Sequence, residues 1–358
     1  MSIKVFDFFS GCGGTSQGFQ ESGMQIVFAI DNDPYAAKTF AGNFPNAHFE
    51  PSNIADFAVD DLQPFIEKCA DDPILFTGCA PCQPYSQQNK QDNPNDKRRA
   101  LLDVFNQFVD KYTPHFVFVE NVPGLQKVAP EDNTPFGDFI KMLERNQYKF
   151  QYKIVASQAY GVPQKRRRLV LIASRLGIID FPHETHGRGT LSLKYSTVSE
   201  WIRDFPPIDI GQTHPDIPNH QAAHISDLNL ERLRATPMGG DRRNWPKHLQ
   251  LECHSNGYTG HTDVYGRMHW NEVSSCLTTK CTSISNGRFG HPEQDRAISA
   301  REAASLQTFP RDFIFAGGLS AVARQIGNAV PVLLAKRFGE NFQEHLKNYK
   351  RVYLNGAI

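Results

Sequence analysis

The chain has 358 residues, of which 40% are hydrophobic and 21% are charged, a composition typical of a soluble globular protein large enough for two domains. Its 38 basic and 38 acidic side chains cancel, so the net charge lacks the basic excess usual in nucleic-acid-binding proteins. No apolar run is long enough to span a membrane, and seven irregularly spaced cysteines favour reduced thiols over a disulfide framework. We therefore expect a cytoplasmic protein.

Short apolar runs alternate with amphipathic stretches in the first half of the chain. The runs that predict buried strands cover residues 5–9, 26–30, 74–76, 116–119 and 169–173. The predicted helices cover the residues after the first glycine turn to about 22, those from 34 onward, 100–111 and a final stretch at 332–348. Strands separated by helices predict an α/β fold with a parallel, doubly wound, Rossmann-like sheet.

The composition changes at about residue 181, where prolines, glycines, histidines and asparagines become frequent and periodicity fades. Three tryptophans in this region still need burial, so we expect a folded, irregular module. The sequence predicts a sheet domain over residues 1–180, completed by 316–358, and a smaller domain over 181–315.

Two loops after the first two strands predict a ligand site. The turn Phe9-Ser10-Gly11-Cys12-Gly13-Gly14 lets the backbone approach a ligand closely beside a helix N-terminus. Asp31, at the end of the second strand, is where a carboxylate usually binds ribose hydroxyls, whereas Asp33, before Pro34, is a good helix N-cap.

A cysteine follows the third strand in the tripeptide Pro81-Cys82-Gln83, where a nucleophile would project into a ligand crevice. Cys79 and Cys82 also have the spacing of a redox pair, but such pairs open a helix, and the polar segment that follows to Arg99 favours a loop. Cysteines near residues 253, 276 and 281 do not have paired zinc-ligand spacing, so we predict no metal site.

Two further segments supply charged groups. Glu120 follows the fourth strand and is expected to face the same crevice as Cys82. Arg166 and Arg168 alternate before the next strand, which would place them on one face of an extended segment.

In this order, and together with residues 301–307 and 327–331, these segments resemble the DNA cytosine-5 methyltransferases. The match covers nearly the whole chain except about residues 181–265, which fit that family's variable target-recognition region. The resemblance implies a monomeric enzyme that uses S-adenosylmethionine, acts on double-stranded DNA by base flipping, and has a restriction endonuclease as a possible partner.

The resemblance also implies roles for individual residues. The residues implied in catalysis are Cys82, Glu120, Arg166 and Arg168. Those implied in cofactor binding are Phe9, Gly11, Gly13, Asp31, Asn32, Asn53, Ile54, Pro81, Asn328 and Val330. Those expected to contact DNA are Gln83, Ser86, Arg98, Arg99, Arg242 and Arg243.

The chain departs from the family pattern at two cofactor positions: Asp31 stands where glutamate is common, and Asn53 stands where aspartate is usual.

Three alternative functions remain. A transfer-RNA cytosine methyltransferase would share the sheet and the cysteine, but would have a reduced recognition region. An inactive regulatory homologue is disfavoured by the intact Cys82, Glu120 and Arg168, and a nicotinamide-dependent dehydrogenase by the incomplete glycine spacing.

Overall fold

The computed structural model describes residues 2–80, 101–124, 134–187, 189, 192–252, 260 and 262–353. The chain forms two compact units. The first comprises residues 1–156, 167–183 and 332–358, and the second comprises 157–166 and 184–331. Residues 157–166 and 316–331 therefore group with the irregular unit, whereas the sequence placed them with the sheet.

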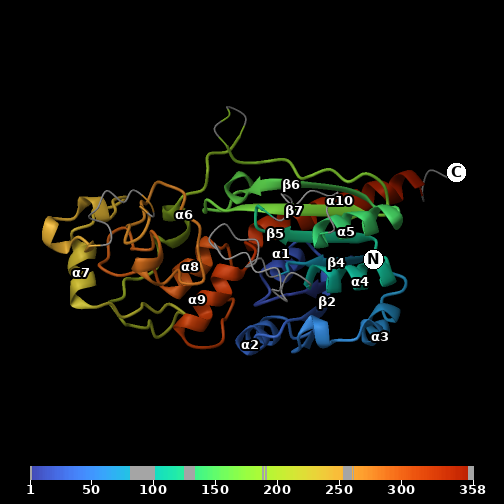
Figure 1. The fold of residues 1–358 in the computed structure, drawn as a ribbon, viewed down its shortest axis with the longest axis horizontal. Coiled ribbons are helices and arrows are strands. Elements are labelled where there is room, and N and C mark those ends of the chain that lie inside the picture. The colour runs from blue at the N-terminus through green and yellow to red at the C-terminus, as the bar shows by residue number, and fades with distance from the viewer. Residues whose placement is uncertain are drawn as a thin grey trace. The chain divides into compact units, whose positions relative to one another are not determined.

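The first unit is built on one seven-stranded sheet (Figure 1). Its strands are β1 (Lys4–Phe8), β2 (Gln25–Ile30), β3 (His48–Glu50), β4 (Ile74–Gly78), β5 (Phe116–Asn121), β6 (Lys149–Ala156) and β7 (Arg167–Ser174), in the order β3-β2-β1-β4-β5-β7-β6. The five strands from β3 to β5 are parallel, while β7 runs antiparallel to both of its neighbours. The prediction of an α/β, doubly wound sheet is confirmed, but the prediction that all strands are parallel is wrong at β7.

Helices cover both faces of this sheet. They are α1 (Gly14–Glu21), α2 (Pro34–Asn43), α3 (Gln63–Glu67), α4 (Leu101–Tyr112), α5 (Pro135–Arg145) and α10 (Val332–Tyr353), with the 3-10 turns η1 (Ile54–Asp56) and η2 (Val59–Leu62). On one face, Phe118 of β5 packs against Phe19 of α1 and Phe338 of α10. The returning helix α10 thus lies beside α1, although the second unit separates them in sequence (Figure 1).

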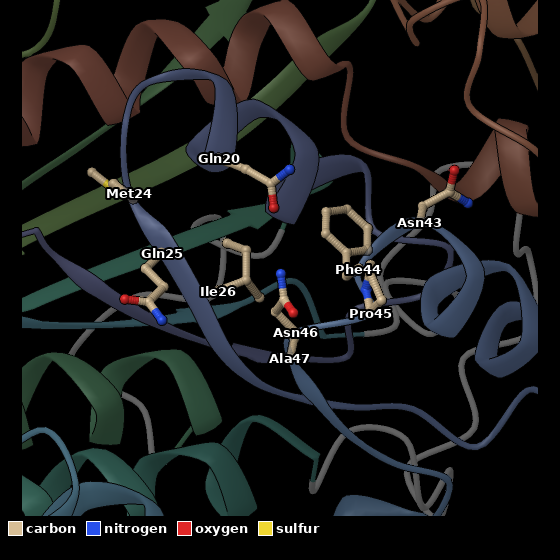
Figure 2. A pocket seen from close by; sticks show the side chains of 9 residues that line it. All are labelled: Gln20, Met24, Gln25, Ile26, Asn43, Phe44, Pro45, Asn46 and Ala47. Carbon is tan, nitrogen blue, oxygen red and sulfur yellow. The ribbon is translucent and has the colours of Figure 1, made fainter.

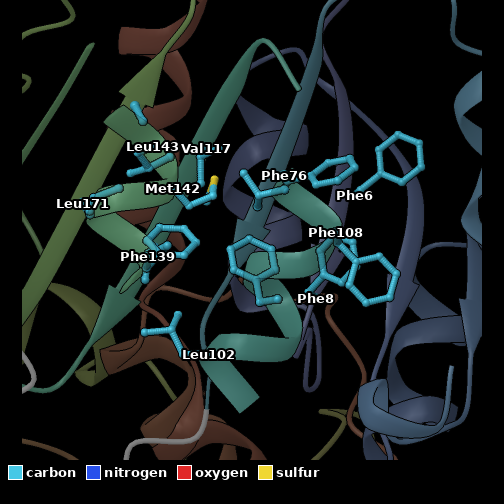
Figure 3. Packing of buried hydrophobic residues seen from close by; sticks show 14 of the residues in the cluster. Phe6, Phe8, Phe76, Leu102, Phe108, Val117, Phe139, Met142, Leu143 and Leu171 are labelled. Atoms are coloured by element: carbon cyan, nitrogen blue, oxygen red, sulfur yellow. The ribbon is translucent and has the colours of Figure 1, made fainter. Parts of the chain in front are cut away.

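The main core lies between the other face of the sheet and the helices α4 and α5 (Figure 3). Alternate residues of β1 face it, and the ring of Phe8 contacts Phe76 at 5.2 Å and Phe108 at 5.1 Å between centroids. Large aromatic side chains supply much of the buried apolar area that holds such a sheet together. The side chains that alternate with Phe6 and Phe8 along β1, including Asp7, point to the opposite face of the sheet, where α1 lies.

The second unit consists of short helices and loops. Its helices are α6 (Val198–Ile202), α7 (Asp227–Arg234), α8 (Ala300–Leu306) and α9 (Leu319–Asn328), with the 3-10 turns η6 (Ser157–Tyr160), η7 (Arg242–Asn244), η8 (Lys247–Leu249) and η10 (Ile284–Asn286). Strand pairing in its described residues is limited to isolated bridges.

Buried arginines take the place of a sheet in this unit. Arg267 donates to the carbonyl oxygens of Leu233, Thr236, His291 and Gln294. Arg301, which is fully buried, donates to the carbonyls of Pro218, Pro310 and Phe313. A buried loop carbonyl without a hydrogen-bond donor is costly. These guanidinium groups donate the hydrogen bonds that backbone N–H groups would donate in a helix or sheet.

None of the described helices combines the length and the apolar character that crossing a membrane requires.

Candidate active site

The glycine turn after β1 is strained and open. Phe9, Gly11 and Gly13 all have positive φ, at 60°, 53° and 94°. A Cβ built on Gly11 would meet nothing within 4 Å, so the turn borders open space. A Cβ on Gly13 would lie 2.4 Å from the ring of Phe44, so packing already accounts for that glycine. A left-handed Phe is costly, and such strain persists where the surroundings or a ligand require it.

The carboxylate of Asp31 joins this turn to the end of β2. Its Oδ2 accepts a hydrogen bond from the backbone N–H of Gly11, and its Oδ1 accepts one from that of Asp33, both at 2.9 Å. Burial raises the pKa of Asp31, while these two N–H donors oppose the increase. Asp33 accepts hydrogen bonds from the N–H groups of Tyr35 and Ala36, which confirms it as the N-cap of α2.

Asn53 and Ile54 lie after β3, at the same carboxyl edge of the parallel strands. The side-chain oxygen of Asn53 caps η1 by accepting from the N–H of Ala55 at 3.1 Å. Ile54 is buried and packs into the main core. Asn32, between Asp31 and the helix α2, is exposed.

Glu120 and Arg168 meet at the next part of this edge. Because β7 runs antiparallel to β5, the start of β7 lies beside the end of β5, with Glu120 opposite Val170. The Nε of Arg168 lies 3.0 Å from Oε1 of Glu120, and their side chains are only 14% and 9% exposed. The resemblance implied that both residues act in catalysis, and the structure pairs them directly.

A side-chain tether lies between this pair and the predicted nucleophile loop. The amide of Asn121 donates to the carbonyl of Ala80 at 3.1 Å, and its oxygen accepts from the N–H of Val122. The residues predicted in and around that loop, Pro81, Cys82, Gln83, Ser86, Arg98 and Arg99, lie outside the described residues.

The sequence interpretation missed Asp7, a fully buried carboxyl group in β1. The hydroxyl of Ser16 donates to its Oδ2 at 2.6 Å, while Oδ1 has no hydrogen-bond partner. Burial raises the pKa of Asp7 to about 7, the Ser16 hydroxyl opposes this, and the Asp31 carboxylate adds to it. The available signal was a single acidic residue inside the otherwise apolar run of residues 5–9.

Comparisons with known proteins identify the family of the chain. The family described as C-5 cytosine-specific DNA methylase matches residues 3–344. The chain belongs to this family. Type II methylase M.HgiDII of Herpetosiphon aurantiacus is 36% identical over 96% of each chain, and type II methyltransferase M1.HphI of Haemophilus parahaemolyticus is 32% identical over 95% of this chain and 86% of the relative.

A solved structure shares the fold across the chain. Entamoeba histolytica methyltransferase EhMeth superimposes with a TM-score of 0.66 at 18% identity, covering 97% of this chain and 99% of that one. The protein is thus a DNA (cytosine-5-)-methyltransferase by family, and the predicted family and enzyme class are confirmed.

Two arginines of this methylase have interior roles that the sequence did not predict. Arg166 precedes β7, is 2% exposed and donates to the carbonyls of Leu277 and Gly327 in the second unit. Arg242 is 8% exposed and donates to the carbonyl of Gly260. Both guanidinium groups are thus buried on backbone carbonyls, which gives each a structural role, and the assignments of Arg166 to catalysis and of Arg242 to DNA contact stay predictions.

Arg243, in contrast, is exposed in the middle of η7. Its guanidinium makes two hydrogen bonds to Asp241, at 2.8 and 2.7 Å, and this pairing lowers the pKa of Asp241 to about 2. It therefore remains a candidate for DNA contact. Asn328, at the end of α9, is exposed and Val330 is buried; both belong to the second unit, so their assignment to the cofactor stays a prediction.

A shallow hollow of about 320 Å³ lies elsewhere on the first unit (Figure 2). It is lined at the end of α1, the start of β2 and the end of α2, and none of its residues is one that we predicted for the methylase site. Because those residues adjoin the amino end of β2, the hollow is remote from the carboxyl edge where the predicted groups gather.

Proposed function

We propose that this DNA methylase modifies carbon 5 of cytosine within a specific double-stranded sequence, by flipping the base and forming a covalent adduct at Cys82. The pairing of Glu120 with Arg168 at 3.0 Å carries the proposal, because it places a carboxyl and a guanidinium group together beside the strand that leads to Cys82. Asn121 supports it by fixing the carbonyl of Ala80, two residues before the cysteine.

The proposed chemistry begins with the thiolate of Cys82. Carbon 5 of cytosine is a poor nucleophile, so the thiolate first adds to carbon 6 and pushes the electrons of the double bond into the ring. Glu120 gives a proton to ring nitrogen 3, and Arg168 donates to the carbonyl oxygen of the base, which together hold the developing negative charge. Carbon 5 then takes the methyl group, and loss of its proton expels Cys82.

The cofactor implied by the family is S-adenosylmethionine, which supplies an electrophilic methyl group when bound. The residues at the edge of the sheet fit it: the turn at Gly11 borders open space, and Asp31 places a carboxylate beside that turn. We propose that Phe9, Asp31 and Ile54 contact S-adenosylmethionine and that Asn53 lies toward its adenine ring. Because Asp31 is already held by two backbone N–H groups, its carboxylate needs no reorganisation to receive a hydroxyl donor.

We propose that residues 181–265 select the DNA sequence and that Arg243 contacts the DNA. A flipped base costs a few kcal/mol of stacking, which protein contacts must recover. An arginine that reads guanine should cost about 1–3 kcal/mol when removed and relax one position of the site. Removing an arginine that binds phosphate should instead weaken binding to all DNA sequences alike.

The relatives' names suggest the cellular setting. Both curated relatives are named type II methylases or methyltransferases. We propose that this protein protects a sequence that a partner restriction endonuclease cleaves, and that it acts as a monomer in the cytoplasm near the nucleoid. Bisulfite sequencing of DNA from cells that express it would identify the methylated sequence.

Covalent trapping tests the mechanism directly. Duplex DNA with 5-fluorocytosine at the target should form a stable adduct, because fluorine at carbon 5 cannot leave as a proton does. Cys82→Ser should abolish the adduct, and Cys69→Ser, which changes a buried cysteine after α3, should retain it. Equal trapping by Cys82→Ser, or a mapped adduct at another cysteine, would overturn the assignment.

A domain exchange tests the assignment of sequence choice. Replacing residues 181–265 with the counterpart from a relative of different specificity should change the methylated sequence while trapping at Cys82 persists. Retention of the original target would place recognition outside this region.

A further inference from the structure

An exposed arginine in the second unit is held by a buried carboxylate. The side chain of Arg243 is 68% exposed, whereas that of Asp241 is 4% exposed. The Nε and Nη2 of Arg243 donate to the two carboxylate oxygens of Asp241 at 2.8 and 2.7 Å, and the backbone N–H of Arg243 donates to Oδ1 at 3.0 Å. The guanidinium group therefore has a fixed position and plane, although it faces solvent.

The protein also holds Asp241 from the other side. The side-chain oxygen of Asn244 accepts from the backbone N–H of Asp241 at 3.0 Å and closes the turn η7. Arg288 donates to Oδ2 of Asp241 at 3.3 Å and to the carbonyl oxygen of Gly240 at 2.6 Å. The hydrogen bond from Arg243 is the largest of the effects that lower the pKa of Asp241 to about 2, so this carboxylate is ionised at neutral pH.

The pairing leaves one edge of the Arg243 guanidinium group open. Such a group forms bidentate pairs along its side edge, with Nε and Nη2, or along its end edge, with Nη1 and Nη2. Asp241 occupies the side edge. Among the residues that the structure describes, none accepts a hydrogen bond from Nη1 of Arg243. The end edge is therefore available to a ligand with two adjacent acceptor atoms.

Two parts of DNA present such acceptors: a phosphate group, and the O6 and N7 atoms of guanine in the major groove. Contact with phosphate depends mainly on positive charge, and an ionised Asp241 beside the guanidinium lowers that charge and repels the phosphate. Guanine carries no net charge, and its two acceptors need donors with a fixed plane and direction. Fixing these donors before binding reduces the cost of ordering them. The pairing thus favours guanine.

We propose that Asp241 is a positioning residue for sequence recognition, which holds Arg243 so that its end edge reads a guanine of the target DNA. This inference rests on the DNA methylase function proposed above, and it adds the base that is read and the residue that orients the arginine. The methylated sequence should therefore contain a G·C pair besides that of the modified cytosine.

DNA duplexes with single base changes test the inference in the full-length protein. Each position of the sequence found by bisulfite sequencing is changed in turn, and the single-turnover rate of methylation is measured. The original protein should lose about tenfold or more when the guanine read by Arg243 is replaced. Arg243→Lys keeps the charge but lacks the planar fork, so it should reduce this preference to about threefold or less and leave the other positions unchanged.

Asp241→Asn keeps the size of the side chain and removes its negative charge. The preference at the same position should fall, because the amide can accept hydrogen bonds through only one of its two terminal atoms. Affinity for DNA of unrelated sequence should stay the same or rise, because the charge of Arg243 is no longer neutralised, and damage to the fold would not produce this combination. The double variant should lose no more preference than Arg243→Lys alone, because both changes act on one contact.

Arg234→Lys is the matched control. Arg234, on α7 of the same unit, is also exposed and paired, with its Nε 3.2 Å from Oδ2 of Asp295. This change should leave the preference at every position unchanged. If circular dichroism shows that Asp241→Asn does not fold, Arg243→Lys still decides, because Arg243 is exposed and the pairing of Asp241 with Arg288 remains.

The outcomes separate this inference from the proposed function. The inference is overturned if Arg243→Lys, or a folded Asp241→Asn, keeps the original preference at every position. It is also overturned if the methylated sequence has no further G·C pair, or if Arg243→Ala weakens binding to all sequences alike and lowers the salt dependence by about one ion, as for a phosphate contact. In each case the proposed function stands. If the unaltered protein methylates no DNA, the proposed function fails and this inference fails with it.

Discussion

Asp7 is the buried carboxyl group whose ionisation we expect to limit the stability of the first unit at neutral pH. It is fully buried on the α1 face of β1, and one of its oxygens has no hydrogen-bond partner. Burial, opposed by the Ser16 hydroxyl and reinforced by Asp31, raises its pKa to about 7. The informative change is Asp7→Asn, which keeps the size of the side chain and removes the ionisation.

The size of the effect follows from the difference in pKa between the folded and unfolded chain. Below about pH 4 both states hold the proton, so the contribution of the protonated group to stability is fully present. Between about pH 4 and 7 only the folded state retains it, and the free energy of unfolding falls by about 1.4 kcal/mol per pH unit. Over this window the loss approaches about 4 kcal/mol, and Asp7→Asn should not show it.

Urea unfolding of both proteins between about pH 5 and 8 measures this difference. Far-ultraviolet circular dichroism follows the helices of both units, while tryptophan fluorescence reports the second unit, where Trp201, Trp245 and Trp270 all lie, so a change seen only by circular dichroism belongs to the first unit. The stability of Asp7→Asn relative to the original protein should rise by about 1.4 kcal/mol per pH unit up to about pH 7. Parallel curves for the two proteins would refute the reasoning.

Ser16→Ala is the matched control for the sign. Its hydroxyl donates to Asp7 at 2.6 Å and favours the ionised carboxylate. Removing it should raise the pKa of Asp7 in the folded state further and so extend the loss of stability to higher pH. A shift to lower pH would contradict the assignment of Ser16 as the donor.

The remaining predictions concern packing and buried polar groups, each measured by urea unfolding. Gly18→Ala should destabilise the first unit by about 1–3 kcal/mol, since its Cβ would lie 2.4 Å from the carbonyl oxygen of Val332. Gly42→Ala, in a helix with open space around it, should stabilise by about 0.5–1 kcal/mol, and equal effects at both glycines would contradict the packing argument. Arg301→Leu should cost about 3 kcal/mol or more because it strands several buried carbonyls, and an unchanged midpoint would show that water replaces the arginine. Trp245→Phe should cost about 1 kcal/mol by removing the indole hydrogen bond to a buried threonine, and a neutral result would mean that this bond adds nothing net.

The sequence alone determined the strands that are buried on both faces. β1, β2, β4, β5 and β7 each contain a run of apolar residues, interrupted in β1 by Asp7, because helices cover both sides of a doubly wound sheet. The cap at Asp33 was equally predictable, because the chemistry of an N-cap is local.

The edge strand β6 and the direction of β7 were not predictable in this way. The residues of β6 (Lys149–Ala156) are exposed or half-buried except Val155, so it lacks the apolar signal of a central strand. The direction of β7 depends on which neighbour it pairs with, and nothing in its own residues encodes that choice.

Tertiary structure also decided what each charged group does. The sequence predicted Arg166 and Arg168 in catalysis and Arg242 in DNA contact, but it could not predict their partners. In the fold, Arg166 and Arg242 are buried on backbone carbonyls and Arg168 pairs with Glu120. The environment of Asp7 was hidden as well, because a pKa depends on burial and on neighbours distant in sequence. The sequence alone showed which candidate site residues are present and in what order they occur, since both are properties of the chain itself. Their partners were settled by folding, because burial and pairing arise only when strands from different parts of the chain meet.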